Sequence, residues 1–85
     1  MNGEQMLHSA ARLVEDRRKS YGDPADSMAA IAARWSLTLG RPVTPAQVVL
    51  CLIDLKLARL AHDPAHWDSL RDIAGYAAVL REVVR

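Results

Sequence analysis

The chain has 85 residues, a formal net charge of +1 and a single cysteine. A chain of this length forms one domain that buries only about 60–65% of its unfolded surface, so self-association is a natural way to bury more. The near-zero charge provides no overall field toward nucleic acid or a membrane, and the lone Cys51 excludes an intrachain disulfide and a cysteine-based zinc cluster.

The first predicted helix covers about residues 5–20. Its apolar residues recur at intervals of three and four, which is the period of an amphipathic helix: Met6, Leu7, Ala10, Leu13 and Val14. On the same period, Arg17 and Tyr21 project from the apolar face. Arg17 is then either a side chain that lies along the rim of the core near a helix C-terminus, or a functional guanidinium.

A Y-G-D-P segment marks the boundary to the second helix, which is predicted over residues 24–39. Gly22 suits a C-terminal turn, Asp23 suits an N-cap and Pro24 suits the first helical position. Capping alone accounts for Asp23, although a role in binding a ligand stays open. The apolar stripe of this helix consists of Met28, Ile31, Trp35 and Leu39, and Trp35 is expected in the core.

The third helix is predicted over residues 45–62, where Thr44 caps and Gln47 closes a capping box. It is apolar nearly all round, and Cys51 in its apolar run is expected in the core. A helix of this kind is either packed by neighbours on several sides or lies in a subunit interface. We therefore expect a dimer or a larger oligomer.

Three charged residues interrupt the third helix. Lys56 and Arg59 lie about 60° apart on one side of it, whereas Asp54 lies on a different side. Asp54 therefore does not share their site unless another subunit contributes it. Lys56 and Arg59 either extend along the rim of the core or bind a ligand.

The last helix is predicted to begin at residue 64 or 67 and to end at residue 84. On its apolar arc Asp72 falls between two valines, with Asp68 one turn earlier at the margin. An ionised carboxylate on a packed face is costly unless a cation or several donors meet it, so Asp72 is the strongest sign of a site. Gly75 in mid-helix indicates a close helix crossing or the approach of a ligand.

Four helices joined by short turns predict an all-α, four-helix bundle-like single domain over residues 1–85. The charged residues that it carries allow two interpretations. In the structural one, Arg17 or Arg59 pairs with Asp72 as a buried network that docks the helices.

In the functional interpretation, carboxylates spaced by four residues bind Mg²⁺ together with a third one from a loop, and cations on the facing helix bind phosphate oxygens. The predicted metal ligands are Asp68, Asp72 and Asp23. The predicted phosphate-binding residues are Arg17, Lys56 and Arg59. The other residues that we assign to the site are Tyr21 and Tyr76. His62 and His66 flank the turn before the last helix and are within reach of a ligand.

Several motifs together carry a resemblance: R-x-x-x-Y-G-D-P at residues 17–24, L-K-L-A-R-L at 55–60 and D-S-x-x-D-I-A-G-Y-A-A at 68–78. The chain resembles a group of small helical proteins common in phages and prophages, the nucleotide-modification-associated domain 1 group. The resemblance implies an all-α protein with a distant kinship to MazG-like nucleoside triphosphate pyrophosphohydrolases, which are helical oligomers that bind Mg²⁺ with acidic residues. By matching motif position it implies a site made of Tyr21, Asp23, Lys56, Arg59, Asp68, Asp72 and Tyr76.

Two departures from those relatives bear on catalysis. The enzymes carry E-x-x-E on one helix and E-x-x-D on the next, whereas this chain offers Asp68, Asp72 and the distant Asp23. Ser27 also stands where an amide side chain is expected after Y-G-D-P. The expected function is therefore binding, with hydrolysis open, of a nucleotide with Mg²⁺ by a phage-type protein. The alternative is a non-catalytic protein that binds a host or phage protein, with the charges as a structural network.

The expected location is the cytoplasm, which is the host cytoplasm if a phage encodes the protein. The N-terminal residues 1–8 lack a basic region followed by a continuous apolar segment, so we expect no signal peptide. The longest apolar stretch, residues 48–53, is far shorter than the roughly 20 residues that span a bilayer.

Overall fold

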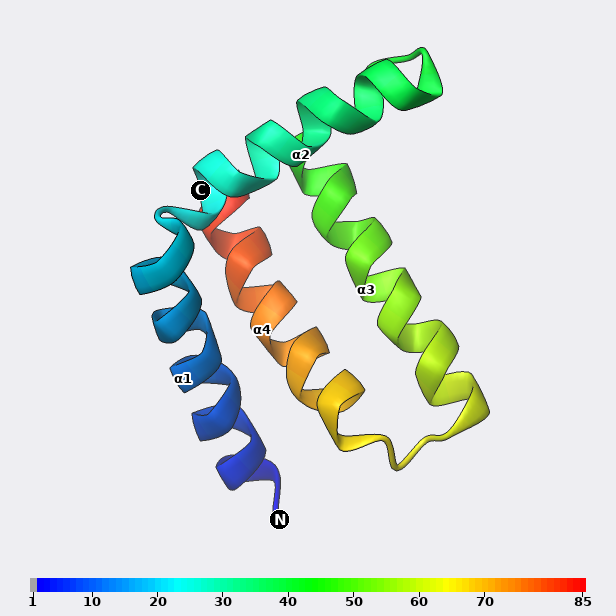
Figure 1. Cartoon of the computed structure of the whole chain (residues 1–85). Coiled ribbons are helices and arrows are strands. Elements are labelled where there is room, and N and C mark those ends of the chain that lie inside the picture. The colour runs from blue at the N-terminus through cyan, green and yellow to red at the C-terminus, as the bar shows by residue number, and fades with distance from the viewer. Residues whose placement is uncertain (1) are drawn as a thin grey trace.

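The computed structural model describes residues 2–85, which form four α-helices joined by short turns and contain no strand (Figure 1). The helices are α1 (Gly3–Tyr21), α2 (Pro24–Leu39), α3 (Pro45–His62) and α4 (Trp67–Val84). The predicted all-α fold is confirmed, and the predicted bounds of α2 and α3 are those observed. None of these helices combines the length and the hydropathy needed to cross a lipid bilayer.

The helix ends follow local capping chemistry. Gly22 ends α1 with φ of 84°, a left-handed conformation that glycine adopts without strain. The carboxylate of Asp23 then accepts a hydrogen bond of 2.9 Å from the backbone N–H of Ala25. Thr44 and Gln47 form the predicted capping box at the start of α3. These turns fix the direction in which each helix leaves its predecessor.

The central helix of the bundle is α4. It packs against each of the other three helices, and it lies between α1 and α3 while α2 crosses one end (Figure 1). Within residues 2–85, α3 contacts α2 and α4 but not α1. The expectation that neighbours pack α3 on several sides is therefore wrong for a single chain, because the chain provides only two neighbours for a helix that is apolar nearly all round.

The interior of the bundle is small. The buried apolar side chains are Ala10, Ala32, Val48 and Val49. The expectation that Cys51 lies in the core is wrong, because Cys51 is exposed. Leu39, at the end of the apolar stripe of α2, is exposed as well. Trp35 is half-buried, so the stripe of α2 is covered only in part.

Gly75 lies buried in the middle of α4, where α4 meets α1. A Cβ atom added there would lie 3.6 Å from Cγ2 of Val14, which is ordinary van der Waals contact. The helix crossing therefore does not require glycine. We predict that Gly75→Ala raises the free energy of unfolding by about 0.5–1 kcal/mol, since alanine is the better helix former. Urea denaturation measures this change, and a loss of stability would contradict the observed spacing of α1 and α4.

Candidate functional site

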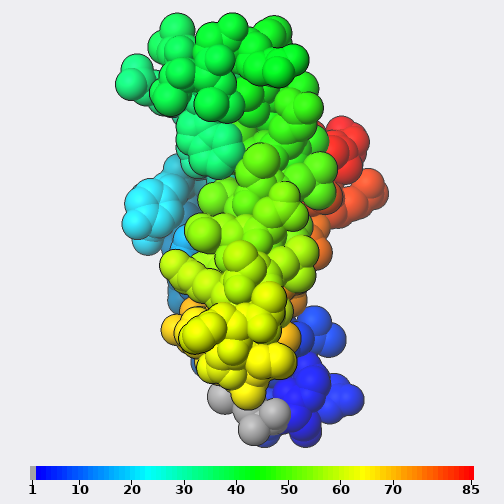
Figure 2. Space-filling model, turned by 90° about the vertical axis from the view of Figure 1, so that its right-hand side faces the viewer, coloured from blue at the N-terminus to red at the C-terminus, as the bar shows by residue number. Residues whose placement is uncertain are grey.

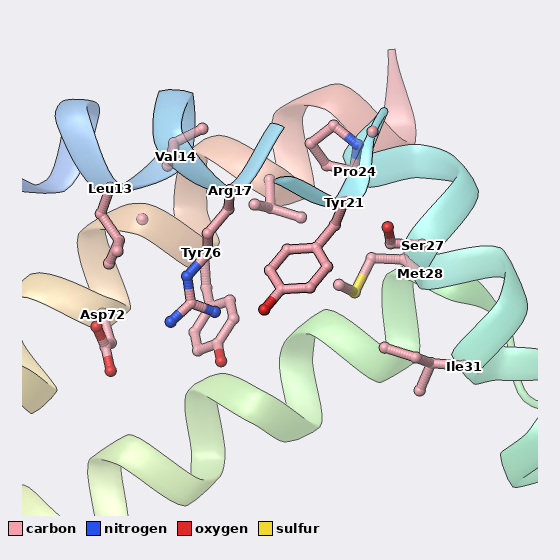
Figure 3. A pocket seen from close by; sticks show the side chains of 13 residues that line it. Leu13, Val14, Arg17, Tyr21, Pro24, Ser27, Met28, Ile31, Asp72 and Tyr76 are labelled. Atoms are coloured by element: carbon pink, nitrogen blue, oxygen red, sulfur yellow. The ribbon is translucent and has the colours of Figure 1, made fainter. Parts of the chain in front are cut away.

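A pocket of about 430 Å³ lies between α1, α2 and α4 (Figure 3). Its walls are mainly apolar and come from all three helices: Leu13, Val14, Pro24, Met28, Ile31 and Val79. The pocket sits beside the Gly22 turn, where the chain passes from α1 to α2. Pockets of this size and character are the usual binding sites for small molecules.

The pocket also brings together four of the predicted site residues: Arg17, Tyr21, Asp72 and Tyr76. The first two come from the last turns of α1, and the other two are one turn apart on α4. In Figure 3 the side chains of Arg17, Tyr21 and Tyr76 extend in the same direction from their helices. The sequence therefore identified the polar part of this pocket, although it did not indicate that Leu13 and Val14 line it.

Arg17 has an exposed guanidinium. In the described part of the chain, no carboxylate lies within ion-pair distance of it and no side-chain hydrogen bond holds it. Arg18, its neighbour, instead pairs with Glu82 of α4 at 3.3 Å. The guanidinium of Arg17 therefore remains able to bind an anion with two parallel hydrogen bonds.

Asp72 is held by two cations. Its Oδ2 lies 3.0 Å from Nζ of Lys56 on α3, and its Oδ1 lies 3.4 Å from Nη2 of Arg71 on α4. The side chains of Lys56 and Asp72 are only 13% and 14% exposed. In the structural interpretation the expected partner was Arg17 or Arg59, and that pairing is wrong because Lys56 is the cation of α3 that meets Asp72.

The environment of Asp72 sets its protonation state. Burial raises the pKa of the carboxyl, but the hydrogen bond and charge of Lys56, together with the charge of Arg71, lower it by more. The net result is a pKa below the ordinary value of 3.8. Asp72 is thus ionised at neutral pH.

Arg71 is a member of this cluster that the sequence reasoning missed. Its Nη2 lies 3.4 Å from Asp72 and 3.8 Å from Asp68, so it faces both acidic residues. The spacing of three residues between Asp68 and Arg71 is a known signal for a pair on one helix face. Nε of Arg71 is buried without a hydrogen-bond partner. Two of the three carboxylates that were predicted to bind a metal, Asp68 and Asp72, therefore have cations beside them.

The predicted Mg²⁺ ligands do not meet in one place. Asp23 caps α2, Asp68 is 64% exposed and Asp72 is paired with Lys56 and Arg71. Within residues 2–85, no three histidine, cysteine, aspartate or glutamate side chains are grouped so that they could hold a metal ion. Binding of Mg²⁺ stays a prediction from the sequence.

Arg59 lies at a second pocket, of about 450 Å³, where α3 ends and α4 begins. His62 and His66 line this pocket with it. Nδ1 of His66 accepts a hydrogen bond of 3.2 Å from the backbone N–H of Ser69 and so caps α4. The three predicted phosphate-binding residues are therefore divided: Arg17 lines the first pocket, Lys56 holds Asp72 and Arg59 lines the second pocket.

Comparison with known proteins shows which family the chain is similar to. Residues 5–84 match the family model described as a domain of unknown function, DUF6378. The chain is 33% identical to the Gene 55 protein of Mycobacterium phage D29 over 81 residues, which are 94% of this chain and 54% of that protein. It is 35% identical to the Gene 55 protein of Mycobacterium phage L5 over 80 residues, which are 92% of this chain and 51% of that protein.

The chain thus spans about half the length of the curated relatives that it matches. No solved structure matches it. The expected relation to a family of phage proteins is confirmed at this level. The kinship with the nucleotide-modification-associated group and with MazG-like enzymes stays a prediction from the motifs.

Removal of the charge on Asp72 tests its structural role. We predict that Asp72→Asn lowers the free energy of unfolding by about 3 kcal/mol, because it leaves Lys56 largely buried without its partner. Asp68→Asn is the matched control on the same helix, and since Asp68 is mostly exposed it should change stability by no more than about 0.5 kcal/mol. Equal effects of the two substitutions in urea denaturation would contradict this role.

The lowered pKa of Asp72 predicts a pH dependence. In the unfolded chain this carboxyl titrates near its ordinary value of 3.8, and in the folded chain it titrates at lower pH. Its contribution to stability is therefore complete above the unfolded value and is lost as the pH falls through the folded value. As the pH is lowered through this acid range, the free energy of unfolding from urea denaturation should fall less for Asp72→Asn than for the natural sequence. If the stability of Asp72→Asn depends on acid pH in the same way as that of the natural sequence, Asp72 is not the cause of that dependence.

Proposed function

The chain belongs to the DUF6378 family, and we propose that it binds a nucleotide in the pocket between α1, α2 and α4. The observation that carries the proposal is the meeting of an unpaired guanidinium with two phenol rings in a mainly apolar pocket. A nucleotide has the complementary parts, a flat base and a phosphate. The proposal concerns binding, and hydrolysis is a separate prediction.

The base would occupy the apolar part of the pocket. Tyr21 is 76% exposed and Tyr76 lies on the facing helix, so both rings are available for stacking. Stacking of a base on an aromatic ring contributes about 1–3 kcal/mol. The thioether of Met28 and the side chain of Ile31 provide further apolar contact. An exposed tyrosine at the rim would then become covered when the ligand binds.

The phosphate would bind to Arg17. A guanidinium presents two parallel N–H donors to phosphate oxygens, and no other protein group in the described chain engages this one. Asp72, ionised at the same pocket, repels a phosphate and accepts hydrogen bonds from an amino group or a hydroxyl. The two charges therefore favour one orientation of the ligand, with the phosphate toward Arg17 and away from Asp72.

The alternative function, a non-catalytic interaction protein, has its own support. Lys56, Asp72 and Arg71 form a charge cluster that joins α3 to α4, as expected of a network that docks helices. In that interpretation the charges serve the fold alone. A ligand screen separates the two, because a docking network predicts no response to nucleotides.

The test is a thermal-shift screen against ribo- and deoxyribonucleotides, each with and without Mg²⁺. A ligand at about 100 times its dissociation constant stabilises the folded chain by about 2.7 kcal/mol, which raises the melting temperature by several degrees. Arg17→Ala should abolish this shift. Arg12→Ala, also on α1 but outside the pocket, should preserve it.

A screen without any shift would contradict the proposal, and so would a shift of the same size in Arg17→Ala. A shift that requires Mg²⁺ would support the predicted metal, whereas a shift without it would support the pocket alone. Analysis of the products then tests hydrolysis.

A further inference from the structure

The side of α3 that faces away from α4 is apolar and exposed. We call it the outer face and define it by Leu50, Cys51, Asp54, Leu55, Leu57 and Ala58, all of which are exposed. These residues fall within about half of the helix circumference. Figure 2 shows α3 running down the middle of this side of the molecule, with the end of α2 above it. Leu50 and Leu57 lie within about 20° of each other on this face, and Cys51 and Ala58 extend the apolar surface beside them.

The area of the molecule indicates how much surface is left without a partner. The accessible surface is 5867 Å². A compact monomer of 9.4 kDa is expected to expose about 5,000 Å². The excess, about 900 Å², is close to the roughly 800 Å² that each partner buries in a standard protein interface. A single interface of ordinary size would therefore remove the excess.

The shape of the chain agrees with this excess of accessible surface. The radius of gyration is 13.5 Å, whereas a compact domain of 85 residues is expected at about 12 Å. The chain is thus more open than a closed bundle of its length, because α1 and α3 stay on opposite sides of α4.

We propose that the outer face of α3 binds the outer face of a second copy of this chain. The distribution of charge favours this partner. Asp54 is the acidic residue of the face, and Arg59 and His62 border it toward the C-terminal end of α3. When two such helices pack antiparallel about a two-fold axis that passes near Leu57, Asp54 of each copy lies beside the basic end of the other, since residue 54 is then opposite residue 60. The face is therefore complementary to itself, as an isologous interface requires.

This contact is separate from the proposed nucleotide site. Arg17 and Tyr21 come from α1, and none of the residues that line the first pocket belongs to α3. The second pocket is lined in part by Leu55 and Ala58, so the second copy would cover it. Failure of dimerisation would thus leave the nucleotide proposal intact. Failure to bind a nucleotide would likewise leave the proposed dimer intact.

Sedimentation equilibrium from about 1 to about 100 μM tests the contact, and we expect a dimer with a dissociation constant of about 1 μM or below. Leu57→Lys and Leu50→Lys should each weaken the dimer at least about tenfold, because each places a charge in the apolar interface. The matched control is Leu7→Lys on α1, where the leucine has a similar exposure, 58% against 51% for Leu57. Circular dichroism verifies that each variant is folded.

Cys51 provides a second readout, because its thiol lies on the outer face and is exposed in the single chain. Its reaction with a disulfide reagent should slow as the protein concentration rises, and it should stay fast in Leu57→Lys. A monomer across the whole concentration range would overturn the proposal. A dimer that neither Leu57→Lys nor Leu50→Lys weakens would place the contact on another surface and would also overturn it.

Discussion

The arrangement of the bundle depends on the ion pair between Lys56 and Asp72. Its atoms are 3.0 Å apart and its side chains are mostly buried, so it joins α3 to the central helix α4 in one register. A buried pair adds little net stability, but its geometry is demanding and disfavours other registers. With Asp72 turned toward Lys56, Tyr76 lies one turn further along α4 and lines the pocket with Arg17. The pair thus positions the α4 side of the candidate site, which Asp72 itself lines.

Local features of the chain were predictable because they depend on neighbouring residues. Asp23 and Thr44 cap helices as their sequence positions indicate, and the bounds of α2 and α3 follow from those caps. The partner of Asp72 was not predictable, since Lys56 and Arg59 lie on the same side of α3 and only the packing of α4 selects Lys56. The exposure of Cys51 has the same cause. An apolar helix does not reveal which of its sides the chain will cover.

Both proposals arise from one limitation of a short chain. Residues 2–85 form four helices, but α1 and α3 do not contact each other, and the buried apolar core is small. Apolar surface therefore remains on two sides of the molecule. Where polar groups such as Arg17 border this apolar surface, the surface forms a pocket suited to a small anionic ligand. On the outer face of α3, where leucines dominate, it suits a second copy of the chain.

The most direct test of the nucleotide site is an NMR titration of the isotope-labelled protein with a mononucleotide. We predict that the ring signals of Tyr21 and Tyr76 shift together, along with backbone signals around Arg17, while signals of the α3–α4 turn stay in place. Shifts centred on Arg59 and His66 would assign the ligand to the second pocket and contradict the account. The absence of any shift at saturating nucleotide would contradict it as well.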